Sequence, residues 1–395
     1  MTIPSSLRIL DLCEFFSDRG GGVRSYLERM AKAAQSAKHE LIVVAPGGAH
    51  EETFQAGMKL IRYPAPRMPY DGTYRMPWRL DLMRAAVARE KPDVVQISSP
   101  FAPALAARFL PRGPVRAYFY HSDPIGCYVR PVLQRALPMQ LAQRTEHTVW
   151  GVQRAISRTC DVTIVAGNWL AEVLEKQGCE RVRTVPFGIS REDLGPRFAD
   201  PELRRRLLGP LANTANAALL LIAGRLAADK RQALLLDALI ELQRTQPVAL
   251  VVLGDGPERA ALQRKAGALR HASFVPFTHN RQEFAAIVAS VDALLHGSTC
   301  ETFGFVVAEA LASGTPVIVP DAGGAGALAK PEYAEAYAPQ ADAAGVARAV
   351  QRLLARPREE MRRAALHAAD TFPSSERHFE DLFRLYRELL GMRPS

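Results

Sequence analysis

The chain has 395 residues, a length that favours two domains over a single core. Hydrophobic residues make up 48% and charged residues 23%, as in ordinary globular proteins, and no run of 18 uncharged apolar residues suggests a membrane-spanning helix. The net charge is +9, and the five cysteines have no CxxC spacing, which argues against a zinc site and fits a reducing compartment.

The first residues run directly into an apolar strand pattern, without the basic and long apolar segments of a secretory signal. We therefore expect a cytoplasmic protein. Peripheral contact with the inner face of the cytoplasmic membrane is left open by this pattern.

Short β-rich runs alternate with helical stretches in both halves, which predicts parallel α/β sheets. In the first half we expect strands at Leu7–Leu12, Glu40–Ala45, Asp93–Ile97, Val115–Tyr120 and Asp161–Ala166, with helices at Val23–Ala37, Arg79–Arg89 and Trp169–Gln177. In the second half we expect strands at Ala218–Ala223, Ala249–Leu253, Ala272–Val275, Ala293–Leu295 and Pro316–Val319, with helices at Gln232–Thr245, Gly256–Gly267 and Val306–Ser313. A final amphipathic packing helix is expected at Arg377–Leu390.

The alternation of apolar strand and helix patterns is interrupted over residues 187–217, where Gly, Pro and charged residues cluster. We expect an N-terminal Rossmann-like domain over 1–195, a C-terminal Rossmann-like domain over 196–376, and a terminal helix over 377–395 that packs back towards the N-terminal domain. Ligands of open α/β sheets bind at the carboxyl ends of the strands, so two such domains facing across a cleft can both contribute to one site.

Three consecutive glycines, residues 20–22, follow the first expected strand and precede a helix. Glycine lets the backbone approach a ligand closely, and a helix N-terminus favours a phosphate or a leaving group that gains negative charge. The run is neither a GxGxxG fingerprint nor a Walker sequence, and a plain turn remains an alternative.

Two basic residues follow the first strand of the second half. Arg225 lies in the sequence AGRL, and Lys230 comes five residues later. A bidentate guanidinium and an ammonium at the end of a strand can clamp a pyrophosphate. The later turn GDGPE, residues 254–258, places Pro257 at a helix start and is interpreted as mostly structural.

The most informative run is ETFGFVVAE, residues 301–309. Glu301 precedes a helix and Glu309 lies inside it, so one carboxylate can orient sugar hydroxyls and the other can bind a ribose diol. An exposed helix face is the alternative for paired glutamates. That alternative is weakened by the apolar neighbours of Glu309, among which a carboxylate needs a partner.

Several of these segments resemble those of a known protein family. The GGG loop, His121-Ser122-Asp123, AGRLAADK at 223–230, GDGPE at 254–258 and ETFGFVVAE occur in the order found in retaining glycosyltransferases of family 4. The chain resembles that family over nearly its whole length, and most resembles its GDP-mannose-dependent mannosyltransferases. The resemblance implies the GT-B fold of two Rossmann-like domains.

The resemblance also implies roles for individual residues. Gly21 and Gly22 would approach the donor phosphate, Arg225 and Lys230 would neutralise the pyrophosphate, and Glu301 would hold the donor sugar. The remaining assignments are Phe303, Gly304 and Phe305 lining the sugar and phosphate sites, Glu309 binding the ribose, and His121 contacting the sugar or positioning the acceptor.

No DxD pair and no His/Cys/carboxylate cluster has the spacing of metal ligands, so we expect no metal and no cofactor besides the nucleotide-sugar substrate. The expected reaction transfers a hexose from a nucleotide sugar onto a lipid, lipid-linked or saccharide acceptor, with retention of the anomeric configuration. GDP-mannose is the first choice of donor. The alternatives are a UDP-sugar donor (glucose or glucuronate), a sugar-nucleotide epimerase, and a non-catalytic sugar-nucleotide-binding module.

The stretch 101–158 holds eight arginines, no lysine and two acidic residues. Basic residues interleaved with apolar and aromatic ones suit an anionic membrane surface, and a solvated basic face is the alternative. Nucleic acid is not an expected partner, because no recognised binding motif accompanies the charge.

Overall fold

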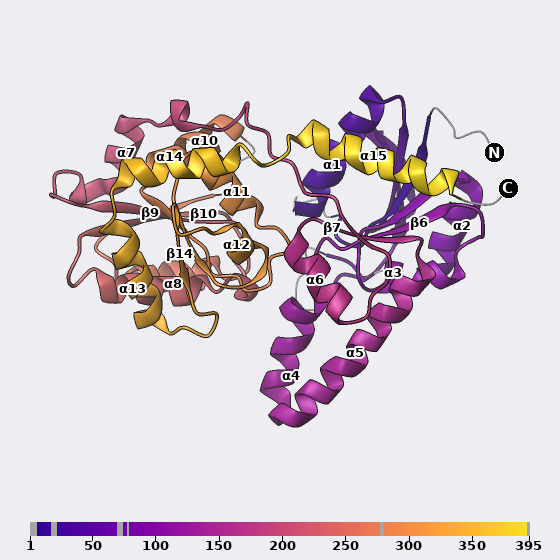
Figure 1. The fold of residues 1–395 in the computed structure, drawn as a ribbon, viewed down its shortest axis with the longest axis horizontal. Coiled ribbons are helices and arrows are strands. Elements are labelled where there is room, and N and C mark those ends of the chain that lie inside the picture. The colour runs from indigo at the N-terminus through magenta and orange to yellow at the C-terminus, as the bar shows by residue number, and fades with distance from the viewer. Residues whose placement is uncertain (1–5, 17–21, 69–73, 77–78, 277–279, 393–395) are drawn as a thin grey trace. The chain divides into compact units, whose positions relative to one another are not determined.

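The computed structural model describes residues 6–16, 22–68, 74–76, 79–276 and 280–392. Contacts divide the chain into two compact units (Figure 1). Unit 1 consists of Met1–Gly188 and Ser375–Ser395, and unit 2 consists of Ile189–Ser374. The expected domain limits at residues 195 and 376 stay a prediction.

The sheet of unit 1 has the strand order β3-β4-β2-β1-β5-β6-β7-β8. Its strands are β1 (Arg8–Leu12), β2 (Glu40–Gly47), β3 (Glu51–Gln55), β4 (Met58–Pro64), β5 (Val94–Ile97), β6 (Val115–Phe119), β7 (Val162–Val165) and β8 (Val182–Thr184). All neighbouring pairs are parallel except β3 and β4. Parallel strands buried on both faces explain why the central runs are almost continuously apolar.

The antiparallel hairpin of β3 and β4 is a feature that the sequence reasoning missed. Ala56 and Gly57, the two residues between the strands, both have positive φ, +48° and +82°. Two such residues form the tight turn whose twist suits a hairpin. The partial burial of β3 at the sheet edge blurs its alternating pattern, so its apolar signal is weak.

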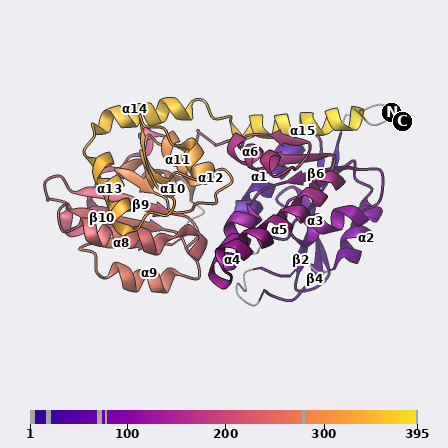
Figure 2. The ribbon, with the colours of Figure 1, turned by 60° about the horizontal axis from the view of Figure 1, so that its bottom comes forward.

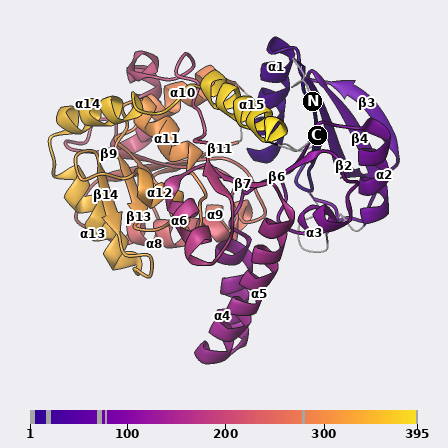
Figure 3. The same cartoon turned by 45° about the vertical axis from the view of Figure 1, so that its right-hand side comes forward.

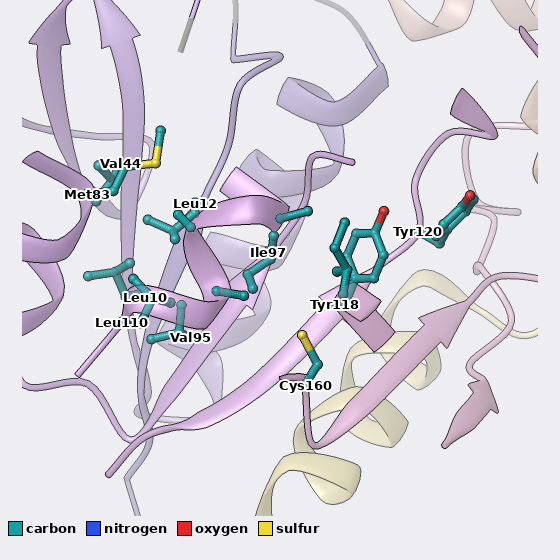
Figure 4. Close-up of a cluster of buried hydrophobic side chains, with 14 of the residues drawn as sticks. Leu10, Leu12, Val44, Met83, Val95, Ile97, Leu110, Tyr118, Tyr120 and Cys160 are labelled. Carbon is teal, nitrogen blue, oxygen red and sulfur yellow. The ribbon is translucent and has the colours of Figure 1, made fainter. Parts of the chain in front are cut away.

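Unit 1 contains nine α-helical or related segments besides short turns among its described residues. They are α1 (Gly22–Ser36), α2 (Leu80–Glu90), α3 (Ala102–Ala106), η1 (Ala107–Phe109), η2 (Ile125–Val129), α4 (Arg130–Ala136), α5 (Met139–Thr159), α6 (Asn168–Lys176) and α15 (Ser375–Gly391). One core cluster joins the strands to α2, α3, α5 and α6 and includes Leu10, Leu12, Met83, Tyr118 and Trp150. Figure 4 shows part of this cluster, with Leu10, Leu12, Val95 and Ile97 side by side.

The opposite face of this sheet carries α1 and α15, which contact each other. Helix α15 is the final amphipathic segment of the chain, and its buried residues are His378, Phe379, Leu382, Phe383 and Tyr386. It packs on unit 1, as Figures 1 and 2 show, although the chain reaches it only after completing unit 2. The expected return of this helix to the N-terminal domain is therefore found.

The sheet of unit 2 is entirely parallel, with the order β11-β10-β9-β12-β13-β14. Its strands are β9 (Ala218–Ala223), β10 (Val248–Leu253), β11 (Ala272–Val275), β12 (Ala293–Leu295), β13 (Val317–Pro320) and β14 (Ala334–Tyr337). Its helical segments are η3 (Pro196–Phe198), α7 (Pro201–Leu208), η4 (Gly209–Leu211), η5 (Ala228–Lys230), α8 (Gln232–Leu242), α9 (Arg259–Ala266), α10 (Arg281–Ser290), α11 (Phe305–Ala312), α12 (Gly323–Leu328), α13 (Ala343–Leu354) and α14 (Arg358–Ala369).

Helices cover both faces of this second sheet. Helix α8 contacts α9 and α13, while α11 contacts α12 and α14, and α10 contacts α7. Figure 2 shows α8 and α9 on one side of the strands and α10, α11 and α14 on the other. Both units are thus Rossmann-like α/β layers, as the alternating sequence pattern predicts.

Candidate active site

The turn after β9 carries Arg225 and Lys230. Strand β9 ends at Ala223, and Gly224 then adopts φ +129°. A Cβ on Gly224 would meet no atom within 4 Å, so only the backbone angle calls for glycine there. The open space beside Gly224 leaves its backbone accessible to a ligand.

The GDGPE turn supports this loop from the end of β10. A Cβ on Gly254 would lie 2.0 Å from the Gly224 carbonyl oxygen, and one on Gly256 would lie 2.3 Å from the Leu226 oxygen. Leu226 N–H donates to the Asp255 carbonyl at 2.8 Å. The two glycines therefore permit close backbone packing, in agreement with the structural role expected for this turn.

Lys230 and Glu301 form an ion pair at the centre of the candidate site in unit 2. Lys230 Nζ lies 2.6 Å from Glu301 Oε1, and also 3.5 Å from Asp229 Oδ2. The side chains of Lys230 and Glu301 are 25% and 21% exposed, so the pair is accessible to solvent. An ammonium beside a carboxylate offers both a phosphate-binding cation and a hydroxyl-binding anion.

Both members of the Lys230–Glu301 pair are ionised at neutral pH. Burial works to lower the pKa of Lys230, but the Glu301 and Asp229 carboxylates outweigh it and raise that pKa above its ordinary value. Burial works to raise the pKa of Glu301, but Lys230 and His296 hold it below its ordinary value. Glu301 is therefore a carboxylate at neutral pH.

A glycine brings the two loops together. Gly297 follows β12, and a Cβ there would lie 2.5 Å from the Lys230 carbonyl oxygen and 3.3 Å from Arg231 Cβ. The backbone that leads to Glu301 passes this closely against the Lys230 loop because residue 297 has no side chain. Sequence reasoning did not single out this glycine.

His296 lies beside Glu301 in the candidate site, and sequence reasoning missed it. Its side chain is 6% exposed, and its Nε2 lies 3.5 Å from Glu301 Oε1. Burial lowers the pKa of His296 to about 4, so the ring is neutral at pH 7. Nε2 has no hydrogen-bond partner among the described residues. A polar residue directly after a buried strand is the signal that could have found it.

The turn from Glu301 to Gly304 packs closely against two further glycines, Gly323 and Gly324. Gly324 N–H donates to the Glu301 carbonyl at 2.6 Å. A Cβ on Gly324 would lie 2.6 Å from the Phe303 backbone, and one on Gly323 would lie 3.0 Å from the Glu301 oxygen. The start of α12 thus fixes the backbone that carries Glu301.

Helix α11 begins directly after this turn. Gly304 has φ +92°, and its carbonyl accepts from the Val307 and Ala308 N–H groups. The Phe303 ring is buried and lies 5.2 Å from the ring of partly exposed Phe305. Phe305 and the backbone of the turn are therefore the parts that can face a ligand.

Glu309 and Arg225 are held by other partners. Glu309 Oε1 lies 3.0 Å from Arg281 Nη1, an arginine that sequence reasoning did not assign to the site. Glu309 thus has the cationic partner that its apolar helix requires. Arg225 Nη2 lies 3.3 Å from Asp229 Oδ1, so Asp229 lies between the guanidinium and the Lys230 ammonium.

In unit 1 the expected site residue His121 follows β6. Its ring stacks on Phe119 at 4.2 Å between centroids and meets the edge of Tyr26 at 4.6 Å. Its Nε2 lies 3.1 Å from Ser98 Oγ. Burial, and then the nearby His378, lower the pKa of His121 to about 3, so it is a neutral ring at pH 7.

The glycine loop is described only in part. Gly21 lies outside the described residues, and Gly22 is the first residue of α1. A Cβ on Gly22 would meet nothing within 4 Å. Among the described residues, nothing therefore crowds the N-terminus of this fifteen-residue helix at Gly22.

Comparisons with known proteins place this geometry in a family. The family model described as Glycosyltransferase Family 4 matches residues 20–193, and the model described as Glycosyl transferases group 1 matches residues 209–369. A GDP-mannose-dependent alpha-mannosyltransferase of Mycobacterium tuberculosis is 30% identical over 326 residues, which is 80% of each chain. The chain belongs to glycosyltransferase family 4.

Other similarities cover nearly all of this glycosyltransferase. A GDP-mannose-dependent alpha-(1-6)-phosphatidylinositol dimannoside mannosyltransferase of M. tuberculosis is 26% identical over 373 residues, 93% of this chain and 92% of the relative. The structure of sucrose-phosphate synthase from Thermosynechococcus elongatus matches with a TM-score of 0.77 at 19% identity, covering 98% of this chain and 100% of the other. The fold is GT-B, and the enzyme is a hexosyltransferase.

Two features are absent from the described residues of this glycosyltransferase. No group of three or more His, Cys, Asp or Glu side chains is arranged to hold a metal ion within them. No helix within them is long and apolar enough to cross a membrane.

Proposed function

We propose that this glycosyltransferase transfers mannose from GDP-mannose to a lipid, lipid-linked or saccharide acceptor, with retention of configuration and without a metal ion. The names of its mannosyltransferase relatives support the donor and the acceptor class. The observation that carries the proposal is the Lys230–Glu301 pair at 2.6 Å, which combines a cation for phosphate with an anion for sugar hydroxyls.

Positive charge for the leaving diphosphate comes from the protein in this proposal. Arg225 and Lys230 receive the charge that develops as the sugar–phosphate bond breaks, and preorganised donors of this kind contribute about 3 kcal/mol each to lowering the barrier. Lys230 has three N–H donors, so it can bind a phosphate oxygen and still hold Glu301. Gly21 and Gly22 are assigned to the donor phosphate, the role that the family resemblance implies for them.

The sugar and nucleoside are assigned to the remaining residues. Glu301 orients hydroxyls of the transferred sugar, and the turn Phe303-Gly304-Phe305 lines the sugar and phosphate sites. Glu309 binds the ribose diol. His121 contacts the sugar or positions the acceptor, and its neutral ring suits hydrogen bonding to a hydroxyl.

Retention follows in this proposal from departure and attack on the same face of the sugar. The leaving phosphate takes the acceptor proton, so no covalent glycosyl-enzyme forms and Glu301 is not a nucleophile. Incubation with GDP-mannose and a panel of lipid and saccharide acceptors, in chelator, tests the proposal. An α-mannosylated product supports it, whereas activity with UDP-sugars alone contradicts it.

We further propose that the α4–α5 region contacts an anionic phospholipid surface. Helix α4 has no buried residue, and Val132, Met139 and Leu141 are 63%, 77% and 49% exposed. Arginines at 135 and 144 lie in the same two helices. Figures 1 and 3 show α4 and the start of α5 extending away from the sheet of unit 1.

Exposed apolar side chains beside arginines favour the interface of an anionic bilayer. Sedimentation with vesicles of phosphatidylglycerol and phosphatidylcholine, compared with phosphatidylcholine alone, tests this contact. Binding only to the anionic vesicles, weakened by salt, supports it, and equal recovery with both contradicts it.

A further inference from the structure

A buried polar network lies beneath α15 in unit 1. Asp11, Gln96 and Ser98 are 0%, 0% and 1% exposed, and Tyr386 of α15 is 0% exposed. Asp11 on β1 and Gln96 on β5 are direct neighbours across the two parallel strands. Burying these polar groups costs stability unless each is hydrogen-bonded, so their arrangement needs a reason.

The hydrogen bonds of this network form a continuous chain to His121. Tyr386 O–H donates to Gln96 Oε1 at 2.5 Å, and Gln96 Nε2 donates to Asp11 Oδ2 at 2.5 Å and to Ser98 Oγ at 3.1 Å. Ser98 O–H donates to Asp11 Oδ2 at 2.6 Å. His121 Nε2 lies 3.1 Å from the same Ser98 oxygen.

The chemistry of a serine hydroxyl decides the direction of the last bond. A hydroxyl has one hydrogen and two lone pairs. The hydrogen of Ser98 is donated to Asp11, so its oxygen can only accept from His121. His121 must therefore carry its hydrogen on Nε2, and because the ring is neutral, Nδ1 is left as an acceptor.

This direction does not depend on the charge of Asp11. Burial raises the pKa of Asp11 to about 7, against the hydrogen bonds from Ser98 and Gln96. Oδ2 accepts two hydrogen bonds, while Oδ1 has no hydrogen-bond partner among the described residues. A proton taken up by Asp11 would sit on Oδ1 and leave Oδ2 as the acceptor of the Ser98 hydrogen.

We propose that Asp11 and Ser98 are positioning residues for His121: they fix its Nε2–H tautomer, in which Nδ1 is the hydrogen-bond acceptor of the ring. This inference rests on the proposed role of His121 in transfer. Gln96 belongs to the same hydrogen-bond network. The hydrogen bond from Tyr386 to Gln96 Oε1 orients the Gln96 amide so that its NH₂ group faces Asp11 and Ser98.

The tautomer can be measured without any reaction. In the full-length protein with ¹⁵N-labelled histidine, we expect the His121 ring to show a protonated Nε2 and an unprotonated Nδ1 at pH 7.5. Asp11→Ala frees the Ser98 hydrogen to turn towards His121, and Ser98→Ala removes the acceptor, so both variants should lose this tautomer. Asp11→Asn can keep an oxygen at the Oδ2 position and should retain it.

Kinetics provide the second readout. Ser98→Ala and Asp11→Ala should lower kcat on the order of tenfold, the effect of losing one oriented hydrogen bond, with the donor KM nearly unchanged. Asp11→Asn should restore most of kcat. Thr163→Val is the matched control, because it removes another buried hydroxyl of the same sheet, which donates to Ser157 at 3.2 Å, and should leave kcat unchanged.

An unchanged His121 tautomer in folded Ser98→Ala would overturn the inference, as would an equal loss of kcat in Thr163→Val. Failure of the proposed function has a different signature. In that case wild-type His121 shows the expected tautomer, its loss in Ser98→Ala is still seen, and His121→Ala retains full turnover.

Discussion

Lys230 Nζ and Glu301 Oε1 lie 2.6 Å apart although 71 residues separate them in the chain. The contact joins the loop after β9 to the loop after β12, two strands that are neighbours in the unit 2 sheet. Each charged group keeps the other ionised in a partly buried position. The pair is thus a preformed charge arrangement at the carboxyl edge of a parallel sheet, where ligands of this architecture bind.

Replacing Glu301 by Gln should separate binding from turnover. The variant keeps the size and hydrogen-bonding capacity of the side chain but loses its charge, so donor affinity should change by less than about threefold while kcat falls by about 100-fold or more. Calorimetry of GDP-mannose binding and a radiolabelled transfer assay measure the two effects. Wild-type turnover by Glu301→Ala would refute the assignment.

Arg225→Ala should weaken donor binding itself. Removing a cation from the proposed pyrophosphate site should raise the dissociation constant for GDP by about tenfold or more. Arg264→Ala on α9 removes one arginine of the same unit that has no assigned role, and should bind GDP like the wild type. Equal affinity of the Arg225 variant and this control would remove Arg225 from the site.

Gly22→Ala should affect function without harming stability. The added Cβ meets no atom of the described residues, and alanine is favoured over glycine at a helical position, so the unfolding free energy should stay equal or rise by up to about 1 kcal/mol. Close approach of a phosphate should nevertheless be hindered and donor affinity reduced. Thermal unfolding and GDP titration test this, and unchanged affinity would indicate plain turn chemistry.

Gly224→Ala is the companion experiment, with the opposite effect on stability. Its φ of +129° is strained for any residue with a side chain, so the substitution should cost about 1–3 kcal/mol of unfolding free energy. Urea denaturation measures this cost. A stability equal to the wild type would mean that the turn accommodates alanine by changing its backbone.

His296 should make stability fall on acidification. The folded-state pKa of His296 is about 4, below its ordinary value of 6.5, so the unfolded chain binds a proton first as the pH falls. Stability is therefore lost between about pH 6.5 and pH 4, by up to about 3 kcal/mol from this group. In His296→Gln the decline between pH 7 and pH 4.5 should be shallower in urea titrations; parallel profiles would contradict the buried neutral ring.

The exposed apolar side chains of α4 and α5 should control vesicle binding. Met139→Glu combined with Val132→Glu should abolish sedimentation with anionic vesicles, because both side chains are largely exposed and carboxylates are repelled by the surface. Phe54→Glu replaces a side chain that is 75% exposed on β3 and serves as the control. Equal loss in the control would assign binding to general charge.

The sequence by itself determined the fold class and the family. Central strands such as β9 and β12 lie where the apolar runs place them, because strands buried on both faces must be continuously hydrophobic. The order of the glycine, AGRL and ETFGF segments gave the family, which the comparisons confirm. Lys230 was chosen with Arg225 as a basic pair after the first strand of the second half, and Glu301 as a carboxylate that precedes a helix in the ETFGFVVAE run; their roles stay predictions.

Only the tertiary structure decided which side chains meet. The pairing of Glu309 with Arg281, the place of His296 beside Glu301 and the chain from Tyr386 to His121 join residues far apart in sequence. Periodicity reports which face of an element is buried, but not which polar group on another element faces it. Asp11 interrupts a buried strand for a reason visible only when β5, β6 and α15 have packed around it, since hydrogen bonds depend on distance and direction.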